Sequence, residues 1–281
     1  MNVNISSPLY LKINKSVFVL SLLLLAFSNP ADSEERVYTL GVFPHLPPKE
    51  LEKVFSPIAA DLAKSTGKKF KLRSNTTFDK FSDSLGKKVF DVAFLQPFDY
   101  ISVSGDDGYQ AVATRTEPLS AVLVTLEEKP YSKLDELKGM RIAFPPETSA
   151  VRHLFQSHIE SSGYQFKSDF SVNYHRSHLS CMQQVVIGDA EACVSAAPMV
   201  RFFEHKMKRK MKVIAESKKI PHALFAIHSR VPEKDKAAIK RAILSWGTTE
   251  EGKRLLTRGR LNPFKEIDDT AYDVIRKMKQ Q

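Results

Sequence analysis

Apolar positions along the chain alternate between two spacings, and this alternation predicts the order of the elements. Short runs rich in β-branched and aromatic residues, such as Val37–Phe43, are typical of strands. Segments such as Leu51–Leu62 instead carry apolar residues three and four apart, which predicts helices with one buried face. The expected strands are 37–43, 70–73, 89–95, 111–115, 121–125, 140–144, 170–174, 192–195, 213–215 and 223–228. The expected helices are 51–62, 78–85, 149–162 and 178–187, followed by terminal helices.

Two residues qualify the first of these helices. Pro57 lies inside its apolar pattern and predicts a kink, or a new helix start that Ser56 caps. Gly67 follows the pattern and predicts a left-handed C-cap.

The alternation of strands and helices predicts an α/β fold in which each sheet is mostly parallel and flanked by helices. Polar breaks with a proline at 127–130 and 216–221 divide this order into parts. We therefore expect two lobes that are connected twice, with hinges near 125–129 and 216–221. Lobe 1 comprises 34–126 and a return segment, 219–281, and lobe 2 comprises 127–218.

The N-terminal residues have the pattern of a secretory signal peptide. Lys12 and Lys15 precede an uncharged apolar run, 17–27, and small residues follow it up to Ser33. A run of this length is too short to cross a bilayer as a helix, so we favour cleavage after Ser33 over a retained anchor. The sequence thus predicts a soluble protein of the periplasm, with residues 1–33 removed.

The charge of the chain indicates the kind of partner. Lys and Arg total 42 against 32 Asp and Glu, a formal net charge of +10, which favours anionic partners. Export argues against nucleic acid, so anionic lipid and small anions remain as partners. No nucleophile elbow, phosphate-binding loop or dinucleotide motif is present, and we expect no enzyme activity and no cofactor. A zinc-dependent hydrolase that uses His175 and His178, which are three residues apart, is the enzyme alternative.

Two cysteines, Cys181 and Cys193, can pair in an oxidising compartment. A disulfide is the first interpretation. Two buried thiols, or a pair of soft ligands for a metal or metalloid, are the alternatives.

Polar residues follow the expected strands at the points where helices begin. In open parallel sheets, ligands bind beyond the carboxyl ends of the strands, where helix N-termini offer unpaired N–H groups. Such ends bind oxyanions. The turns concerned are 44–45, 74–77, 96–98, 147–149 and 176–178. Each could equally be an ordinary helix cap.

Several ordered motifs resemble those of the periplasmic substrate-binding proteins of phosphate, phosphite and phosphonate transporters. They are the opening strand with the proline-containing helix (40–62), the strand and turn 90–100, the segment 134–144, the Ser-His turn at 177–178 and the turn 188–192. The resemblance implies a type II binding-protein fold of two lobes that close on a ligand without catalysing a reaction.

The resemblance also implies which residues contact the anion. Members of that family hold the oxygens with a Ser-Thr-Ser turn and a Ser-His turn. Transferred to matching positions, these turns nominate Thr148, Ser149, Ser177 and His178, with Tyr100 on the facing lobe. Glu147 stands where the family has the first serine, and Arg176 could supply positive charge with its planar guanidinium.

These observations predict a monomeric solute-binding protein that captures a small anionic ligand for an inner-membrane ABC permease. The alternative is a sensor that presents its closed form to a signalling receptor, for example in response to an arsenic oxyanion held by cysteine. The basic run 206–212 could dock such a partner or could simply be a solvated face.

Overall fold

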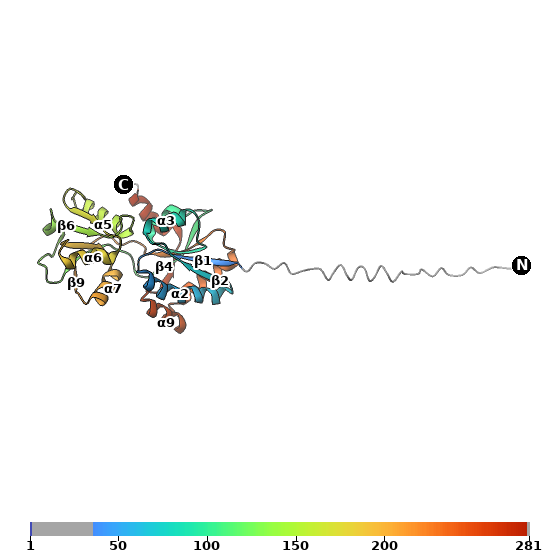
Figure 1. Ribbon diagram of the computed structural model, residues 1–281. Coiled ribbons are helices and arrows are strands. Elements are labelled where there is room, and N and C mark those ends of the chain that lie inside the picture. Colours follow the sequence, from blue (N-terminus) through green and yellow to red (C-terminus); the bar gives the residue numbers. More distant parts are fainter. Residues whose placement is uncertain (2–35, 280–281) are drawn as a thin grey trace. The chain divides into compact units, whose positions relative to one another are not determined.

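The computed structural model describes Met1 and residues 36–279 (Figure 1). All the elements described below lie in the unit of the chain that begins at Val37. Apart from Met1, the expected signal peptide lies outside the described residues. Within residues 36–279, none of the helices combines the length and apolar character needed to cross a bilayer.

Two sheets organise the elements, and the first has six strands in the order β11-β4-β10-β3-β1-β2. These strands are β1 (Val37–Val42), β2 (Lys69–Arg73), β3 (Val92–Leu95), β4 (Tyr109–Arg115), β10 (Leu224–His228) and β11 (Phe264–Glu266). Its helical elements are α2 (Pro48–Thr66), α3 (Phe78–Gly86), α4 (Pro97–Val103), α8 (Glu233–Ser245), α9 (Glu250–Gly259), η2 (Asp269–Tyr272) and α10 (Asp273–Lys279). We call this part the six-stranded half.

The second sheet has five strands in the order β7-β6-β8-β5-β9. They are β5 (Val122–Leu126), β6 (Arg141–Phe144), β7 (Ser171–Tyr174), β8 (Ala192–Ser195) and β9 (Met211–Glu216). The helical elements of this part are η1 (Leu134–Leu137), α5 (Ala150–Ser161), α6 (His178–Ile187) and α7 (Ala197–Met207), and Figure 1 shows α5, α6 and α7 gathered about this sheet. We call this part the five-stranded half.

Both sheets are mixed rather than mostly parallel. In the first, β1 pairs in parallel with β2 and β3, but β10 runs antiparallel to β3 and β4, and β11 antiparallel to β4. In the second, β6 pairs in parallel with β7 and β8, whereas β5 runs antiparallel to β8 and β9. The four strands that flank the two crossings, β4, β5, β9 and β10, all take part in antiparallel pairs.

The chain passes between the halves twice, and the two crossing segments pair with each other. The first, 116–121, precedes β5, and the second, 217–223, follows β9. Leu119 and Ile220 exchange two backbone hydrogen bonds of 2.9 Å, and the Ala121 amide donates to Ser217 Oγ at 2.9 Å. We call this pair of segments the crossing ribbon.

The first crossing lies earlier than the sequence pattern indicated. Strand 121–125 was expected to end lobe 1, with a hinge at 125–129. The structure instead pairs β5 with β8 and β9 of the second sheet. Apolar periodicity identifies a strand but not its sheet partners, which explains the difference. The second crossing overlaps the proline-containing break expected at 216–221 and extends two residues beyond it.

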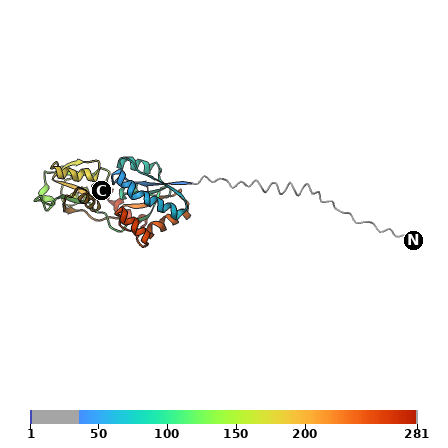
Figure 2. The same ribbon diagram turned by 60° about the horizontal axis from the view of Figure 1, so that its bottom comes forward.

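Helix α2 is one continuous helix that contains Pro57, so the expected new start at Ser56 does not occur. The C-cap of α2 is Gly67, and its φ of 65° is left-handed, as expected. Buried Leu51, Phe55 and Ile58 form the apolar face that the spacing predicted. In Figure 2 the blue α2 lies beside the red C-terminal helices, and α2 contacts both α8 and α9.

Aromatic side chains form the core beneath the carboxyl ends of β1 and β3. Phe94 is its centre, with ring centroids 5.5 Å from Phe43, 5.3 Å from Phe55 and 4.9 Å from Phe225. Trp246 closes the cluster from α8 and is 1% exposed. Such aromatic packing gives a rigid base to whatever lies above it.

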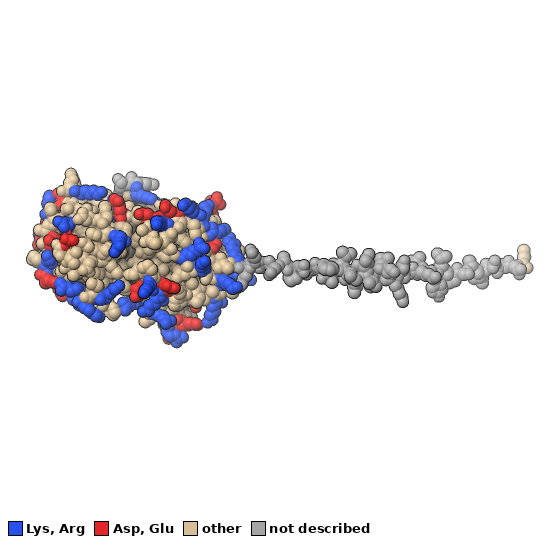
Figure 3. Space-filling view, viewed as in Figure 1, with Lys and Arg blue, Asp and Glu red and all other residues tan. Residues whose placement is uncertain are grey.

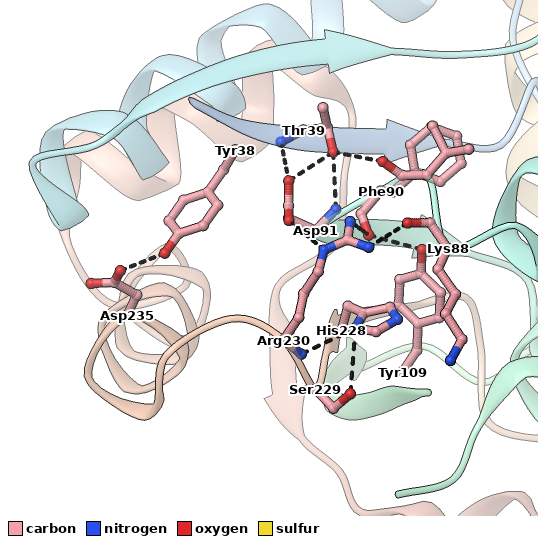
Figure 4. Close-up of polar contacts among 11 residues, drawn as sticks. Tyr38, Thr39, Lys88, Phe90, Asp91, Tyr109, His228, Ser229, Arg230 and Asp235 are labelled. Atoms are coloured by element: carbon pink, nitrogen blue, oxygen red, sulfur yellow. Dashed lines mark hydrogen bonds and ion pairs between the residues drawn. The ribbon is translucent and has the colours of Figure 1, made fainter. Parts of the chain in front are cut away.

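A polar network fixes the opposite, amino ends of the strands (Figure 4). The Asp91 carboxylate accepts hydrogen bonds from the Thr39 amide at 2.8 Å, from Thr39 Oγ1 at 2.9 Å and from Arg230 Nε at 2.9 Å. Arg230 also donates to the Phe90 carbonyl at 2.8 Å. The network joins β1, the start of β3 and the segment after β10, and it leaves their other ends available for a site.

Candidate functional site

A cavity of about 60 Å³ lies where the two halves meet, beyond the carboxyl ends of β1 and β3. Such a volume holds about four water molecules, or one small solute. Most of its lining is apolar and includes Phe43 and Phe94 of the aromatic core. Its polar lining residues are His45, Gln96, Arg115, His178 and His222.

Helix starts from the five-stranded half surround the cavity. Its lining includes Ala150 and Val151 at the start of α5, His178 at the start of α6, and Pro198 in the first turn of α7. The first-turn amides of a helix have no partners within that helix and carry the positive end of its dipole. Together these helix starts make the cavity favourable for negative charge.

Gln96 joins the two halves across the cavity. Its side chain, at the start of α4, donates to the Thr148 carbonyl at 2.8 Å and accepts from the Ala150 amide at 2.9 Å. Beside it, the Phe98 ring stacks on the His153 ring with centroids 4.7 Å apart. These contacts bring the start of α5 against the six-stranded half.

Arg115, the last residue of β4, brings a buried cation to the cavity. Its side chain is 8% exposed, and Glu117 lies 3.9 Å from its guanidinium. Glu117 is shared, because it also pairs with Arg201 at 3.4 Å and accepts from Asn262 at 2.6 Å. Arg115 Nε is buried without a hydrogen-bond partner among the described residues. Burial lowers the pKa of Arg115 to about 10, so it remains protonated at neutral pH.

Hydrogen bonds to the backbone fix which nitrogen of two cavity histidines carries the proton. His222 Nδ1 accepts from the Ala223 amide at 2.6 Å, so the neutral ring has its proton on Nε2. That Nε2 is buried and has no partner among the described residues. His45 Nδ1 lies 2.9 Å from the Phe43 carbonyl and donates to it, which leaves Nε2 as an acceptor. The cavity therefore offers donors at Arg115 and His222 and an acceptor at His45.

The cavity histidines are neutral at neutral pH, chiefly because burial disfavours the charged form. Desolvation lowers the pKa of His45 to about 4, and the charge of Arg115 acts in the same direction. Desolvation lowers the pKa of His178 to about 3. The pKa of His222 is also lowered by burial and by Arg115. The positive charge at the cavity is therefore that of Arg115.

A disulfide holds His178 in position. Cys181 and Cys193 are bonded to each other, with Cα atoms 5.8 Å apart, so the disulfide interpretation is confirmed. The bond ties the first turn of α6 to β8. His178, which begins α6, lies 3.0 Å through Nδ1 from the Oγ of Ser195, which ends β8. Because both thiols are consumed, the alternative in which they bind a metalloid is not available to this form of the protein.

The residues nominated by the Ser-Thr-Ser and Ser-His turns lie in different environments. His178 lines the cavity. Ser149, the N-cap of α5, is 1% exposed and precedes the lining residue Ala150, and its Oγ has no hydrogen-bond partner among the described residues. Ser177 Oγ accepts from the Ser180 amide at 3.1 Å and thus caps α6. Thr148 is exposed and contributes its carbonyl to Gln96.

Tyr100 and Arg176 do not line the cavity. The Tyr100 hydroxyl donates to Asp269 at 2.8 Å and accepts from the Ala111 amide at 3.2 Å, so it packs inside the six-stranded half. Arg176 is exposed on the turn before α6. Arg115, and not Arg176, is the arginine that lines the cavity.

Glu147, which stands where the family has the first serine of its Ser-Thr-Ser turn, does not line the cavity. It is exposed and pairs with Arg152 of α5 at 3.7 Å. The arginine offsets part of the negative charge of Glu147.

Sequence reasoning missed Arg115 and His222 and did not select His45 or Gln96. The sequence did contain a signal for His45 and Gln96, because both lie in turns that follow expected strands, 44–45 and 96–98. Arg115 ends a strand and His222 precedes one. They reach the same edge of the sheet because β4 and β10 are antiparallel, which the apolar pattern does not reveal.

The expected alternative of a zinc site at His175 and His178 has no supporting geometry. Within residues 36–279, no three His, Cys, Asp or Glu side chains are grouped so as to hold a metal ion. His178 instead pairs with Ser195 and faces the cavity.

Known proteins share this architecture. The solved binding-protein component of an ABC phosphonate transporter from Pseudomonas aeruginosa is 14% identical, with a TM-score of 0.76 over 88% of this chain and 86% of that one. PhnD1 of Prochlorococcus marinus, solved with methylphosphonate, is 15% identical, with a TM-score of 0.76 over 88% and 98%. A Xanthomonas citri protein solved with ATP is 11% identical, with a TM-score of 0.67 over 87% and 96%. At these identities the similarity establishes the fold, which is that of the type II periplasmic binding proteins, as expected.

No curated protein matches the sequence. A family description does match, over residues 40–272: "ABC transporter, phosphonate, periplasmic substrate-binding protein". This match spans both halves, the crossing ribbon and the cavity. The chain belongs to the periplasmic substrate-binding proteins of phosphonate ABC transporters.

Proposed function

We propose that this protein captures a small oxyanion of the phosphonate class in the cavity between its halves and delivers it to an ABC permease. Buried Arg115 is the observation that supports this assignment most directly. Its guanidinium is 8% exposed, and the one carboxylate that pairs with it among the described residues lies 3.9 Å away, so the buried charge is under-compensated. Two of the three oxygens of a phosphonate would satisfy its planar fork with paired hydrogen bonds.

The arrangement of donors and acceptors favours one protonation state of the ligand. His222 Nε2–H and the Arg115 N–H groups bind deprotonated oxygens. His45 Nε2 accepts, so it suits an oxygen that carries a proton. The expected ligand is a tetrahedral oxyanion with one remaining OH group. Sulfate, which has none at neutral pH, would face the lone pair of His45.

Helix starts and the buried serine complete the proposed anion contacts. The amides at the start of α5 and α6 favour negative charge, and Ser149 Oγ is a buried hydroxyl that needs a partner. His178 would contact the ligand while Ser195 orients its ring. Ser177 is proposed to act by capping α6, and Thr148 by its carbonyl bond to Gln96.

Closure about the crossing ribbon is the proposed means of capture. The six-stranded half, 36–115 and 224–279, would act as one lobe and the five-stranded half, 122–216, as the other. Each supplies part of the cavity lining, so neither alone forms the site. An exported protein that closes in this way over its solute would release it at the permease in the periplasm.

Isothermal titration calorimetry tests the proposal with methylphosphonate, phosphite, phosphate and sulfate. We expect the phosphorus oxyanions to bind and sulfate not to bind. Arg115→Gln should weaken methylphosphonate binding by about a hundredfold, since it removes the buried charge that pairs with the ligand. Exposed Arg241→Gln is the matched control. Equal affinity of the Arg115 variant and the wild type, with unchanged thermal unfolding, would refute this role.

A further inference from the structure

A second, larger hollow adjoins the cavity and spans both halves. We call it the outer groove. Its volume is about 790 Å³, and it shares His45, Arg115, Pro198 and Met199 with the lining of the cavity. The two hollows are therefore neighbours, and Arg115 borders both. In the proposed complex, a ligand whose head occupies the cavity beside Arg115 would direct its substituent into the outer groove.

Basic side chains line the outer groove from both sides. They come from α2 and the end of α9 in the six-stranded half and from α7 in the five-stranded half, and they are Lys53, Arg258, Arg260, Arg201, Lys206 and Lys208. Within the described part of the chain, Glu50 is the one acidic residue that lines it. Figure 3 shows Lys and Arg side chains along the lower edge of the molecule, over α7 and α9.

Most of this charge is not neutralised by neighbours. Arg201 pairs with Glu117, but no carboxylate between residues 36 and 279 pairs with Lys53, Lys208, Arg258 or Arg260. Positive charges held on facing walls repel one another, and the potential in a hollow between low-dielectric walls is reinforced. A negatively charged group in the outer groove would relieve this repulsion from both halves at once.

We infer that the outer groove is a second anion subsite and that the natural ligand is a phosphonate or phosphate ester whose substituent carries a further negative charge. This inference rests on the proposed function, since the cavity must hold the phosphoryl head. It specifies the substituent: anionic rather than apolar or cationic. A substituent that touches both walls would also favour the closed arrangement of the halves.

Three phosphonates with different substituents test this inference, with methylphosphonate as the common reference. They are 3-phosphonopropionate, propylphosphonate and 2-aminoethylphosphonate, with anionic, apolar and cationic ends respectively. Titration calorimetry at low ionic strength should show 3-phosphonopropionate binding about tenfold tighter than propylphosphonate, and 2-aminoethylphosphonate binding more weakly than both. Added salt should reduce these differences, because it screens exposed charges.

A pair of substitutions, one on each wall, tests whether the groove is responsible. Lys208→Gln with Arg260→Gln should remove most of the preference for 3-phosphonopropionate over propylphosphonate. The matched control, Lys234→Gln with Arg241→Gln, removes the same charges from the exposed surface of α8 and should leave the preference intact. If both double variants lose this preference equally, it arises from the overall positive charge of the protein and not from the outer groove. That result would overturn the inference.

The remaining outcomes separate this inference from the proposed function. If methylphosphonate binds but the three substituents give equal affinities, the outer groove takes no part and the inference alone is wrong. Tighter binding of 2-aminoethylphosphonate than of 3-phosphonopropionate also overturns it. If no phosphonate binds, including methylphosphonate, the proposed function and the inference are both wrong.

Discussion

Acidification should destabilise this protein through the buried histidines, and His178 gives the sharpest test. Its folded pKa is lowered to about 3, while its unfolded pKa is about 6.5. The neutral ring is therefore favoured by folding, and the associated stability is full above pH 6.5 and is lost as the pH falls toward 3. At pH 5.0 the unfolded ring is mostly charged and the folded ring is not. This difference in protonation lowers the free energy of unfolding by about 2 kcal/mol relative to its value at pH 7.5.

Substitution by asparagine removes the titration but keeps a polar group at the Nδ1 position. His178→Asn can still hydrogen-bond Ser195 Oγ, which lies 3.0 Å from the native Nδ1. Between pH 7.5 and 5.0 the variant should lose about 2 kcal/mol less unfolding free energy than the wild type does. Buried Trp246, the single tryptophan, reports urea unfolding at each pH.

The comparison depends on the change with pH rather than on absolute stability, so any packing cost of the substitution cancels. His205→Asn, at an exposed position of α7, is the matched control and should follow the wild type. If His178→Asn loses as much stability on acidification as the wild type, the buried neutral ring is not a source of acid sensitivity. The reasoning about the cavity histidines would then fail.

Three further changes test the framework around the site. Replacing Cys181 and Cys193 by alanine should lower the urea-unfolding free energy by about 3 kcal/mol, because the bond closes a loop of sequence separation 12; equal stability would contradict this. Asp91→Asn should lower the free energy of unfolding by about 2 kcal/mol. In a double-mutant cycle with Arg230→Gln, the two losses of unfolding free energy should be strongly coupled rather than additive. Gly41→Ala should lower the free energy of unfolding by about 2 kcal/mol, because the added Cβ would overlap the ring of Phe90. An unchanged melting temperature would contradict that packing.

The sequence was sufficient to predict the elements and the fold class because apolar spacing depends on local burial. The helix over residues 51–62 and the left-handed cap at Gly67 are examples. Ordered motifs then identified the family, and the match over residues 40–272 confirms that identification. Pairing of the cysteines was also predictable, from their number and the expected compartment.

The cavity residues were harder to predict because their positions depend on strand direction and on the path between sheets. Arg115 and His222 are 107 positions apart in the numbering and meet because β10 runs antiparallel to β4. For the same reason, strand β5 was grouped with the strands before it, whereas it pairs with β8 and β9 of the second sheet. Tyr100 was nominated by its position after a motif, but its direction of side-chain projection placed it against Asp269. Local pattern does not determine which face of a short helix meets a cavity.

The crossing ribbon limits how the two halves could move in the proposed closure. Slip of one segment along the other would break the two backbone hydrogen bonds between Leu119 and Ile220. Leu119 also lines the cavity, so the crossing ribbon forms part of its wall. In the proposed closure, the halves would therefore open on the side of the cavity away from the crossing ribbon. A covalent crosslink between the halves on that side would then hold a bound solute in the cavity. A crosslink between the two segments of the crossing ribbon would leave solute exchange unaffected.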